Sequence, residues 1–508
     1  MVFPRTPTKR WLAGLALVAA LAGCSAVGER TTTPAAYVSQ ALPDQVLPAT
    51  FVGRAVPDNS TARAQSETLR TQYSVVDSGT PTQSLTLAAA LSLAGVENPR
   101  IAQADEATRA GQAQLLQARV LLLPTLTGGV NYHWHNGTLQ GSGGIIRNVE
   151  SQDLYYGAGA AAIGAGPVAI PGVRVWAHLG DAAFEPRAAQ QRLFGLLFAA
   201  QATRNSTLLQ VAEYYLDLVA AEERLKAIRQ SEQEFAEVGR LTANFAKAGQ
   251  GRQSDAERAQ AETHLLHDDA ERATGDLAIA SANLAELLNQ DPAVRLTVEN
   301  GLVPLELVTA DAELNSLLAR AQSNRPEVGA SVAAVAEART RLRQERVRPL
   351  LPELSIGFSA GNFGGGGSLA ASRFDHFDSR IDFDAIAVWS LHNAGVANVA
   401  ASRQRRAELG AALFEQQRVL DHISREVSEA LALIKARRAQ IDTAQRQLAT
   451  AERAYKLDLE RARQLEGRPI ELLDSARLLA DARRDRIQAI VGFNQAQFRL
   501  FVALGNTP

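Results

Sequence analysis

Four short stretches of this 508-residue chain alternate apolar and polar residues, and each lies beside a very long helical stretch. Residues 126–135 place Leu, Gly, Val, Tyr and Trp at every second position, with polar residues or glycine between them. Residues 355–361 and 380–391 alternate in the same way, and 173–179 do so with Trp176 as an exception on the polar side. Such alternation indicates strands with one apolar and one polar face. We therefore expect strands at 124–135, 172–181, 352–361 and 379–391.

Two segments without proline predict unusually long helices. At 1.5 Å per residue, residues 188–247 would span about 90 Å and residues 397–466 about 105 Å. In both, apolar residues recur at alternating spacings of three and four, which is the pattern of a coiled-coil seam. Each long helix is followed by a tight turn and a return helix that ends near Leu288 or Leu504. Helices of this length need lateral packing in a bundle.

The chain repeats its own organisation. The segment LLPTL at 122–126 corresponds to LLPEL at 350–354, and LAELLNQDP at 284–292 corresponds to LFVALGNTP at 500–508. Each half reads helix, strand, Gly-rich loop, strand, long helix, tight turn and return helix. We therefore predict two repeats, 85–295 and 296–508, with hairpin-tip loops at 136–172 and 362–377.

The N-terminus has the pattern of a secretory signal peptide over residues 1–23, with basic residues followed by an apolar run of about a dozen residues. Cys24 is the only cysteine in the chain and follows Leu-Ala-Gly, which resembles a bacterial lipobox. That resemblance implies a covalent lipid anchor on Cys24, and Ser25 after it implies sorting to the outer membrane. The alternative is a chance cysteine after an ordinary cleavage site. Residues 24–84 are rich in Thr, Pro, Ser and Ala and are predicted to form an extended tether.

Several functional classes are disfavoured by the sequence. The formal net charge of −2 does not suggest nucleic-acid binding. We find no Ser/His/Asp set, phosphate-binding loop or zinc-ligand spacing, so we expect neither an enzyme nor a cofactor other than the lipid. His133 and His135 share a strand face, but a polar surface explains them better than a metal site. His264 and His267 are interpreted as part of a solvated helix face, and the arginines between 339 and 348 as helix-end electrostatics.

The predicted strands are too few to close a barrel, because the smallest single-chain membrane barrels use about eight strands. Sheet edges in lipid must nevertheless be paired. We therefore expect a mainly α protein with membrane β structure, in which several copies pool their strands in one transmembrane β-barrel. The long antiparallel coiled-coil hairpins would extend together from one rim of that barrel.

In this arrangement the chain resembles the TolC-like outer membrane efflux proteins, and specifically their NodT-like lipoprotein branch. The resemblance extends from about Leu85 to Gly505 and rests on several motifs in order. These are the repeated LLP segments, Leu-His-Asn-Ala-Gly at 391–395, Gly467 with ELLDSA at 471–476, and Asn-Gln-Ala-Gln-Phe at 494–498. The resemblance implies a homotrimer in the outer membrane of a Gram-negative bacterium, with a helical tunnel in the periplasm. It also implies docking to a periplasmic adaptor protein and an inner-membrane pump, and export of small molecules.

The same resemblance assigns roles at the hairpin tips. Carboxylates just after the second glycine turn line the closed periplasmic end in this family, and Glu471 and Asp474 occupy those positions. Repetition in a trimer would stack acidic rings that favour cations; the alternative is that they are solvated first-turn acids. Tip or adaptor contact is further expected for Gly249, Gly251, Asp255, Gly467 and Arg468. Gln464 stands where a well-known member of the family has a tyrosine latch.

Two rival functions follow from the same pattern. A pore-less, lipid-anchored coiled-coil lipoprotein would serve the cell envelope structurally and would neither form stable trimers nor conduct ions. A passive porin would carry all its strands in one chain and would lack long helical hairpins.

Overall fold

A computed structural model describes residues 82–159, 173–299, 301–368, 372–464 and 468–508. All of these residues belong to one compact unit, Val56–Pro508. The predicted signal peptide, Cys24 and Gly467 lie outside the described residues, as does the predicted tether apart from its last three residues. Within the described part of the chain, no helix is both long enough and apolar enough to cross a membrane.

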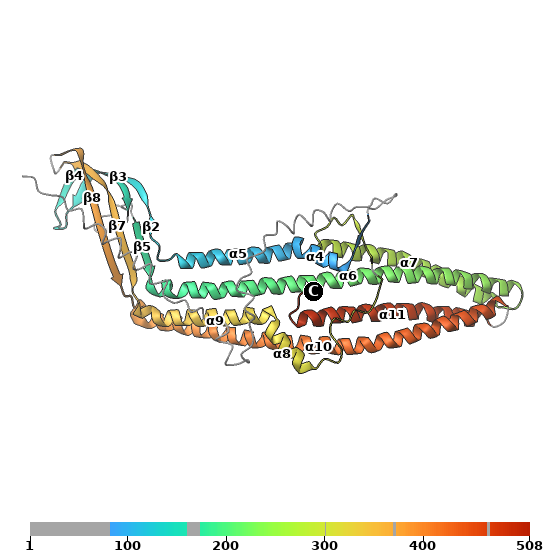
Figure 1. The fold of residues 1–508 in the computed structure, drawn as a ribbon. Coiled ribbons are helices and arrows are strands. Elements are labelled where there is room, and N and C mark those ends of the chain that lie inside the picture. The colour runs from blue at the N-terminus through green and yellow to red at the C-terminus, as the bar shows by residue number, and fades with distance from the viewer. Residues whose placement is uncertain (1–81, 160–172, 300, 369–371, 465–467) are drawn as a thin grey trace, which may run out of the picture. The chain divides into compact units, whose positions relative to one another are not determined.

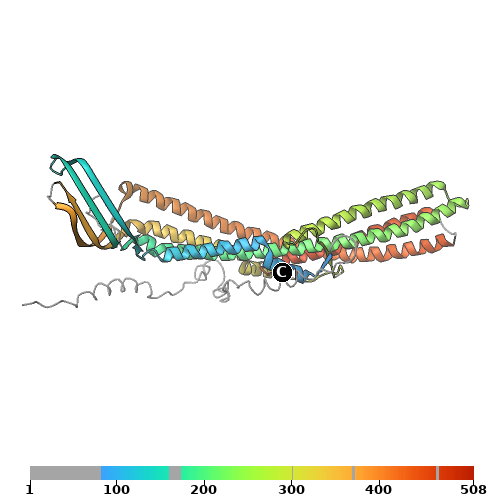
Figure 2. The same ribbon diagram turned by 90° about the horizontal axis from the view of Figure 1, so that it is seen from above.

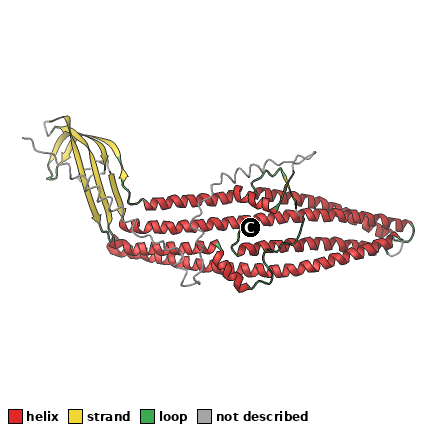
Figure 3. Cartoon of the chain, viewed as in Figure 1, coloured by secondary structure: helices red, strands yellow, loops and turns green. Residues whose placement is uncertain are grey.

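Helices dominate this unit (Figure 3). The two longest are α6 with 69 residues and α10 with 68 residues. Return helices follow each of them, and shorter helices precede them. The α-helices of the described chain are α4 (Leu87–Glu97), α5 (Pro99–Arg119), α6 (Leu179–Lys247), α7 (Gln253–Leu287), α8 (Leu314–Asn324), α9 (Pro326–Val347), α10 (Val396–Arg463) and α11 (Pro469–Ala503).

The long helices pack side by side rather than around a globular core (Figures 1 and 2). On one flank α6 contacts α5 and α7, and on the other it contacts α9 and α11. In turn, α9 and α11 contact α10. The predicted coiled-coil seams are buried in this packing, as Leu218 and Ile434 at 0% exposure illustrate. Both long helices therefore bury their seam against partners from the same chain.

Buried apolar residues form separate clusters along the helices. One cluster joins α4, α6 and α7, and a second joins α8, α9, α10 and α11. A third cluster lies toward the hairpin ends and contains Phe235 of α6, Ala259 of α7, Tyr455 of α10 and Leu472 of α11. This third cluster attaches the α6–α7 hairpin to the α10–α11 hairpin.

Six strands form one antiparallel sheet next to the start of α6 (Figure 1), separate from the two-stranded pair of β1 and β6 described below. Its strands are β2 (Thr125–Leu126), β3 (Gly128–Gln140), β4 (Ile146–Gly159), β5 (Val173–His178), β7 (Glu353–Gly367) and β8 (Ser372–Val388). Pairing places β2 and β3 in one row and β4 and β5 in the next, followed by β7 and then β8. The sheet is thus four rows wide, which matches the number of strands expected from the sequence.

The strand boundaries differ from the prediction in the supposed loops. Residues 136–172 were expected to form one loop, but β3 continues to Gln140 and β4 occupies Ile146–Gly159. Likewise β7 extends to Gly367 and β8 starts at Ser372, within the expected loop 362–377. Backbone pairing along both neighbours of β4 stabilises that strand although its side chains alternate poorly. Gly159 at the end of β4 pairs with Ser359, and Val173 at the start of β5 pairs with the adjacent Phe358 of β7.

The start of α6 also differs from the prediction. The helix begins at Leu179 and contains Pro186, so it starts before the proline-free segment 188–247 that was predicted to be helical. His178 caps it, since its Nδ1 accepts a hydrogen bond from the Gly180 N–H at 3.0 Å. The expected strand 172–181 therefore ends at His178. Residues 82–84 were expected to be the end of the tether, but Thr82–Leu85 forms β1, which pairs in parallel with β6 (Arg295–Val298).

The order of elements is similar in the two halves of the chain. The first half contains α5, the β2–β5 strands, α6 and α7, and the second contains α9, β7, β8, α10 and α11. The two-fold sequence repeat itself stays a prediction.

Candidate functional site

One face of the sheet is apolar across all four rows. The register aligns Leu126, Val173, Phe358 and Phe383 in one cross-strand row on this face. Val130 is 73% exposed and Phe383 69% exposed, whereas Ala177 on the same face is buried, so this face is largely uncovered toward the two outer rows of the described sheet. An uncovered apolar sheet face of this width needs lipid or another protein surface.

The opposite face carries charged and polar side chains. Arg380 pairs with Asp382 at 2.8 Å, and Asp382 accepts a hydrogen bond from the buried Ser359 hydroxyl at 3.3 Å. The register places Arg174, Trp176 and Glu353 on this same face. The sequence alternation placed Trp176 on the polar side of its strand, and the register confirms this: Trp176 lies on the polar face, whereas Trp134 lies on the apolar face. Trp389 falls just beyond the end of β8 and is exposed.

Both lateral edges of the sheet are unpaired among the described residues. The row of β2 and β3 pairs only inward, with β5 and β4. At the opposite edge, β8 pairs only with β7. The described part of one chain therefore presents two free rows of backbone N–H and C=O groups next to an apolar face.

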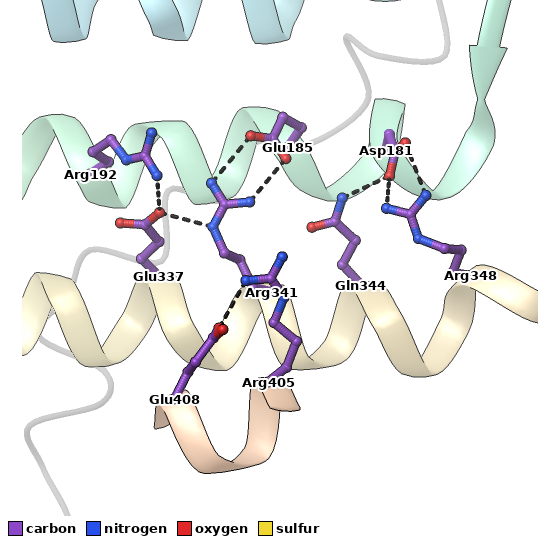
Figure 4. A network of polar contacts seen from close by, with 9 residues as sticks. All are labelled: Asp181, Glu185, Arg192, Glu337, Arg341, Gln344, Arg348, Arg405 and Glu408. Carbon is purple, nitrogen blue, oxygen red and sulfur yellow. Dashed lines mark hydrogen bonds and ion pairs between the residues drawn. The ribbon is translucent and has the colours of Figure 1, made fainter. Parts of the chain in front are cut away.

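A network of ion pairs joins α6 to α9 beside the sheet (Figure 4). Arg348 binds Asp181 through two hydrogen bonds of 2.6 and 3.2 Å, and Gln344 donates to the same carboxylate at 2.8 Å. Arg341 contacts Glu185 at 3.3 Å and Glu337 at 2.9 Å. The sequence interpretation as helix-end electrostatics was therefore wrong for Arg341 and Arg348, which bind another helix. These contacts also explain why α6 begins before Pro186.

Burial affects the charge state within this network. Burial alone would lower the pKa of the Arg341 guanidinium, but the carboxylates of Glu337 and Glu185 outweigh it and raise that pKa overall. The hydrogen bond from Arg405 lowers the pKa of Glu408, which lies on α10. Both pKa shifts favour the charged forms of Arg341 and Glu408. The ion pairs of Arg341 and Arg348 join α9 and its C-terminal end to α6.

The first hairpin tip is a glycine turn. Gly249 has a φ of +71°, and the N–H groups of Gln250 and Gly251 both donate to the Phe245 carbonyl at 3.0 Å. A Cβ on Gly251 would lie 3.0 Å from the Phe245 Cβ, so this position also favours glycine. Asp255 follows in the first turn of α7, is half-buried and lies 3.6 Å from Arg258.

The second hairpin tip presents its acids to solvent. Glu471 and Asp474 are both exposed on α11, whereas Leu472 and Leu473 between them are buried. The Glu471 carboxylate lies 3.9 Å from an Arg461 nitrogen on α10. Arg468 is exposed at the N-cap of α11, and Gln464 is exposed at the end of α10. The structure thus places Glu471 and Asp474 on one accessible helix face, as their spacing predicts.

The histidine candidates do not form a ligand set. His133 lies opposite Asp153 on the polar sheet face, and His267 contacts Glu232 at 2.9 Å on the helix surface. Among the described residues, no three His, Cys, Asp or Glu side chains are grouped to hold a metal ion.

A cavity of about 470 Å³ lies where α11 ends and α9 begins, between α6 and α10. Its arginines are paired with carboxylates: Arg325 with Glu327 and Glu426, Arg425 with Glu429, and Arg499 with Glu213. These pairs link the surrounding helices and form no nucleophile–base arrangement.

Two polar residues of the 494–498 motif have a structural role that the sequence did not reveal. Asn494 is 1% exposed and bonds the backbone of Val303 and Leu305, each at 2.8 Å. Gln497 accepts hydrogen bonds from the N–H groups of Leu307 and Val308 and donates to the Val308 carbonyl. These amides fix the irregular segment before α8 onto α11. Buried amides within an apolar helix were the only sequence signal for this contact.

Several solved structures share this fold. The chain matches the outer-membrane channel OprN with 19% identity and a TM-score of 0.68, over 82% of this chain and 89% of that chain. It matches the Campylobacter jejuni CmeC outer membrane channel with 17% identity and a TM-score of 0.70, over 85% and 90%. For the open state of the Neisseria gonorrhoeae MtrE outer membrane channel the values are 21% and 0.65, over 83% and 89%.

Comparison of sequences finds no relative: neither a family profile nor a curated protein matches the chain. The structural likeness nevertheless confirms, at the level of the fold, the predicted resemblance to the TolC-like outer membrane efflux proteins. The chain has the mainly helical fold of these outer membrane channels.

Proposed function

We propose that this chain is one subunit of an outer-membrane efflux channel. In this proposal three copies pool their strands in one transmembrane barrel, and their helices form a tunnel through the periplasm. The apolar sheet face contacts lipid and the polar face lines the water-filled path. Small molecules then leave the cell through this duct.

The observation that carries the proposal is the unfinished sheet. Its apolar face is exposed and both of its edges are free within the described chain. In lipid, unpaired backbone groups cost several kcal/mol each, so the edges must pair with further strands. Other copies of the same chain supply such strands with matching apolar and polar faces. The likeness in fold to outer membrane channels supports the same arrangement.

Partners and anchoring complete the proposal. A lipid on Cys24 would hold the N-terminus at the outer membrane, and the hairpin tips would meet a periplasmic adaptor protein that connects to an inner-membrane pump. The residues proposed for this contact are Gly249, Gly251, Asp255, Gly467 and Arg468. No catalytic step is proposed, since transport through a duct needs none.

Glu471 and Asp474 are proposed to line the periplasmic constriction. Their exposure on one face of α11 supports this role, because three copies would present six carboxylates to the path. The double variant Glu471→Gln/Asp474→Asn is expected to reduce cation selectivity, measured as a smaller reversal potential across a salt gradient. An unchanged reversal potential would place both residues away from the constriction.

Planar-bilayer recording of the purified protein tests the proposed function. We expect stable single-channel conductance from an oligomer that resists mild detergent. The rival function, a pore-less structural lipoprotein, is favoured if the membrane-inserted protein never conducts.

A further inference from the structure

Trp176 stands out on the polar sheet face because it is a large aromatic side chain among charged ones. The side chain is 65% exposed, although its indole N–H and one part of its ring contact neighbouring side chains. Its indole N–H donates a hydrogen bond to the Glu353 carboxylate, and the Arg174 guanidinium carbon lies 5.2 Å from the ring centroid. The ring is thus held in place while most of its surface remains open to solvent.

Arg174 is positioned but lacks a carboxylate partner. Its Nε donates to the Ser355 hydroxyl at 3.1 Å, and no described carboxylate lies within ion-pair distance of it. Arg380 on the same face differs, since Asp382 neutralises it at 2.8 Å. A guanidinium fixed through Nε still presents its terminal N–H groups, which suit the two oxygens of a carboxylate.

The location of this pair matters for access. Trp176 pairs with Ser355 of β7 on one side of β5. On the other side β2 pairs only with Val173 and Arg174, so β2 flanks the strand at Arg174 but not at Trp176. The strand ends at His178, and α6 follows directly. The pair therefore lies where the sheet meets the helices, on the face that the proposed function assigns to the water-filled path.

We propose that Arg174 and Trp176 form a binding point for planar aromatic carboxylates in transit. The carboxylate would accept hydrogen bonds from the terminal nitrogens of Arg174, and the aromatic ring would stack on the open surface of Trp176. Glu353 and Ser355 act as positioning residues, because they fix the indole and the guanidinium. The proposal rests on the proposed function only for the direction in which the polar face points.

Ligand-observed fluorine NMR tests this site on the full chain in detergent. The probe is para-(trifluoromethyl)benzoate, and the neutral control is the corresponding benzyl alcohol. We expect line broadening of the benzoate at concentrations where the alcohol shows little. Arg174→Gln is expected to weaken benzoate binding roughly tenfold, the value of one charge-assisted contact, and to leave the alcohol unchanged. Trp176→Leu should weaken binding of both probes.

Matched variants keep the test specific. Arg380→Gln alters a paired arginine on the same face, and Trp134→Leu alters an exposed tryptophan on the apolar face; neither should change the benzoate affinity. Equal broadening by both probes, or unchanged binding in Arg174→Gln, would overturn the proposal. Bilayer recording distinguishes failure of the proposed channel function from failure of the proposed binding point. Absence of conductance contradicts the channel function, whereas conductance without benzoate binding by NMR contradicts only the binding point.

Discussion

The helices and the six-stranded sheet differ in how much of their apolar surface is buried within one chain. In the helical body, Phe235 and Phe493 are each 1% exposed and pack against residues of the same chain. In the sheet, Phe383 is 69% exposed, and Val130 and Ile381 on the same apolar face are exposed as well. The helices thus bury most of their apolar surface within one chain, whereas the sheet exposes apolar residues that, in the proposed function, contact lipid.

The difference also appears in the polar contacts. The helices are joined by ion pairs with little exposure, such as Arg483 with Glu234, whose side chains are 13% and 19% exposed. The sheet keeps its polar contacts on one face, and its edge strands offer unpaired backbone groups. Variants that act on one region but not the other are therefore the most informative.

The largest effect on stability is expected from Phe493→Ala. Removing this buried ring leaves a cavity in the α8–α11 cluster and costs about 3–5 kcal/mol. The measurement is the midpoint of helix unfolding in detergent, followed by circular dichroism. Phe383→Ala removes the same ring from the exposed sheet face and should leave that midpoint nearly unchanged; equal losses would contradict the contrast between the two regions.

A smaller but more specific effect is expected from Ile381→Arg. An arginine on a lipid-facing strand costs roughly 2–4 kcal/mol near the bilayer centre, so reconstitution into liposomes should fall sharply while the helical signal persists. Asp378→Arg, on the opposite face of β8, is the matched control and should insert normally. If both variants insert equally well, the apolar face does not contact lipid.

Arg483→Met tests the connection between the two hairpins. Arg483 of α11 donates hydrogen bonds of 2.7 and 2.8 Å to the Glu234 carboxylate of α6. Without Arg483 this half-buried carboxylate loses its charged partner, which should lower the free energy of unfolding by roughly 2 kcal/mol. Unfolding in detergent would measure this loss. The surface pair Arg418–Glu415, within α10, provides the control: Arg418→Met should show no measurable change, and a comparable loss there would argue against a special role for the buried pair.

The smallest effect concerns Tyr455, which lies near the same ion pair. Burial, followed by repulsion from Glu234, raises the pKa of the Tyr455 hydroxyl to about 12. The unfolded chain loses this proton at lower pH than the folded one, so its contribution to stability is complete below about pH 10 and is lost as the pH rises toward 12. Tyr455→Phe should flatten the fall in stability over this range. If Tyr455→Phe leaves the pH dependence of stability unchanged, the Tyr455 hydroxyl does not cause it.

Much of the fold was predictable because its signals are local. Alternation in 126–135 and 355–361 identified strands, and the absence of proline identified both long helices. The backbone after β8 was not predicted in this way: Asn393, Ala394 and Gly395 all take positive φ values, whereas Leu-His-Asn-Ala-Gly was noted only as a motif of the family resemblance. Where the residues of a segment alone favour its secondary structure, that structure can be predicted from the sequence.

The failures arose where distant contacts outweigh local preference. Residues 146–159 alternate poorly, yet pairing with β3 and β7 makes them a strand. Pro186 suggests a helix boundary, yet Arg341 and Arg348 bind Glu185 and Asp181 in the helical turns just before it. At the hairpin tips, spacing placed Glu471 and Asp474 on one face, but it did not reveal that Asp255 is half-buried against its own helix. Such pairings depend on the packed structure.

The most direct test of the central idea, that one chain supplies only part of a shared barrel, is native mass spectrometry of the purified protein released from detergent. The account predicts a particle with three times the mass of a single chain, held together without cross-linking. A stable monomer that stays soluble without detergent would contradict it.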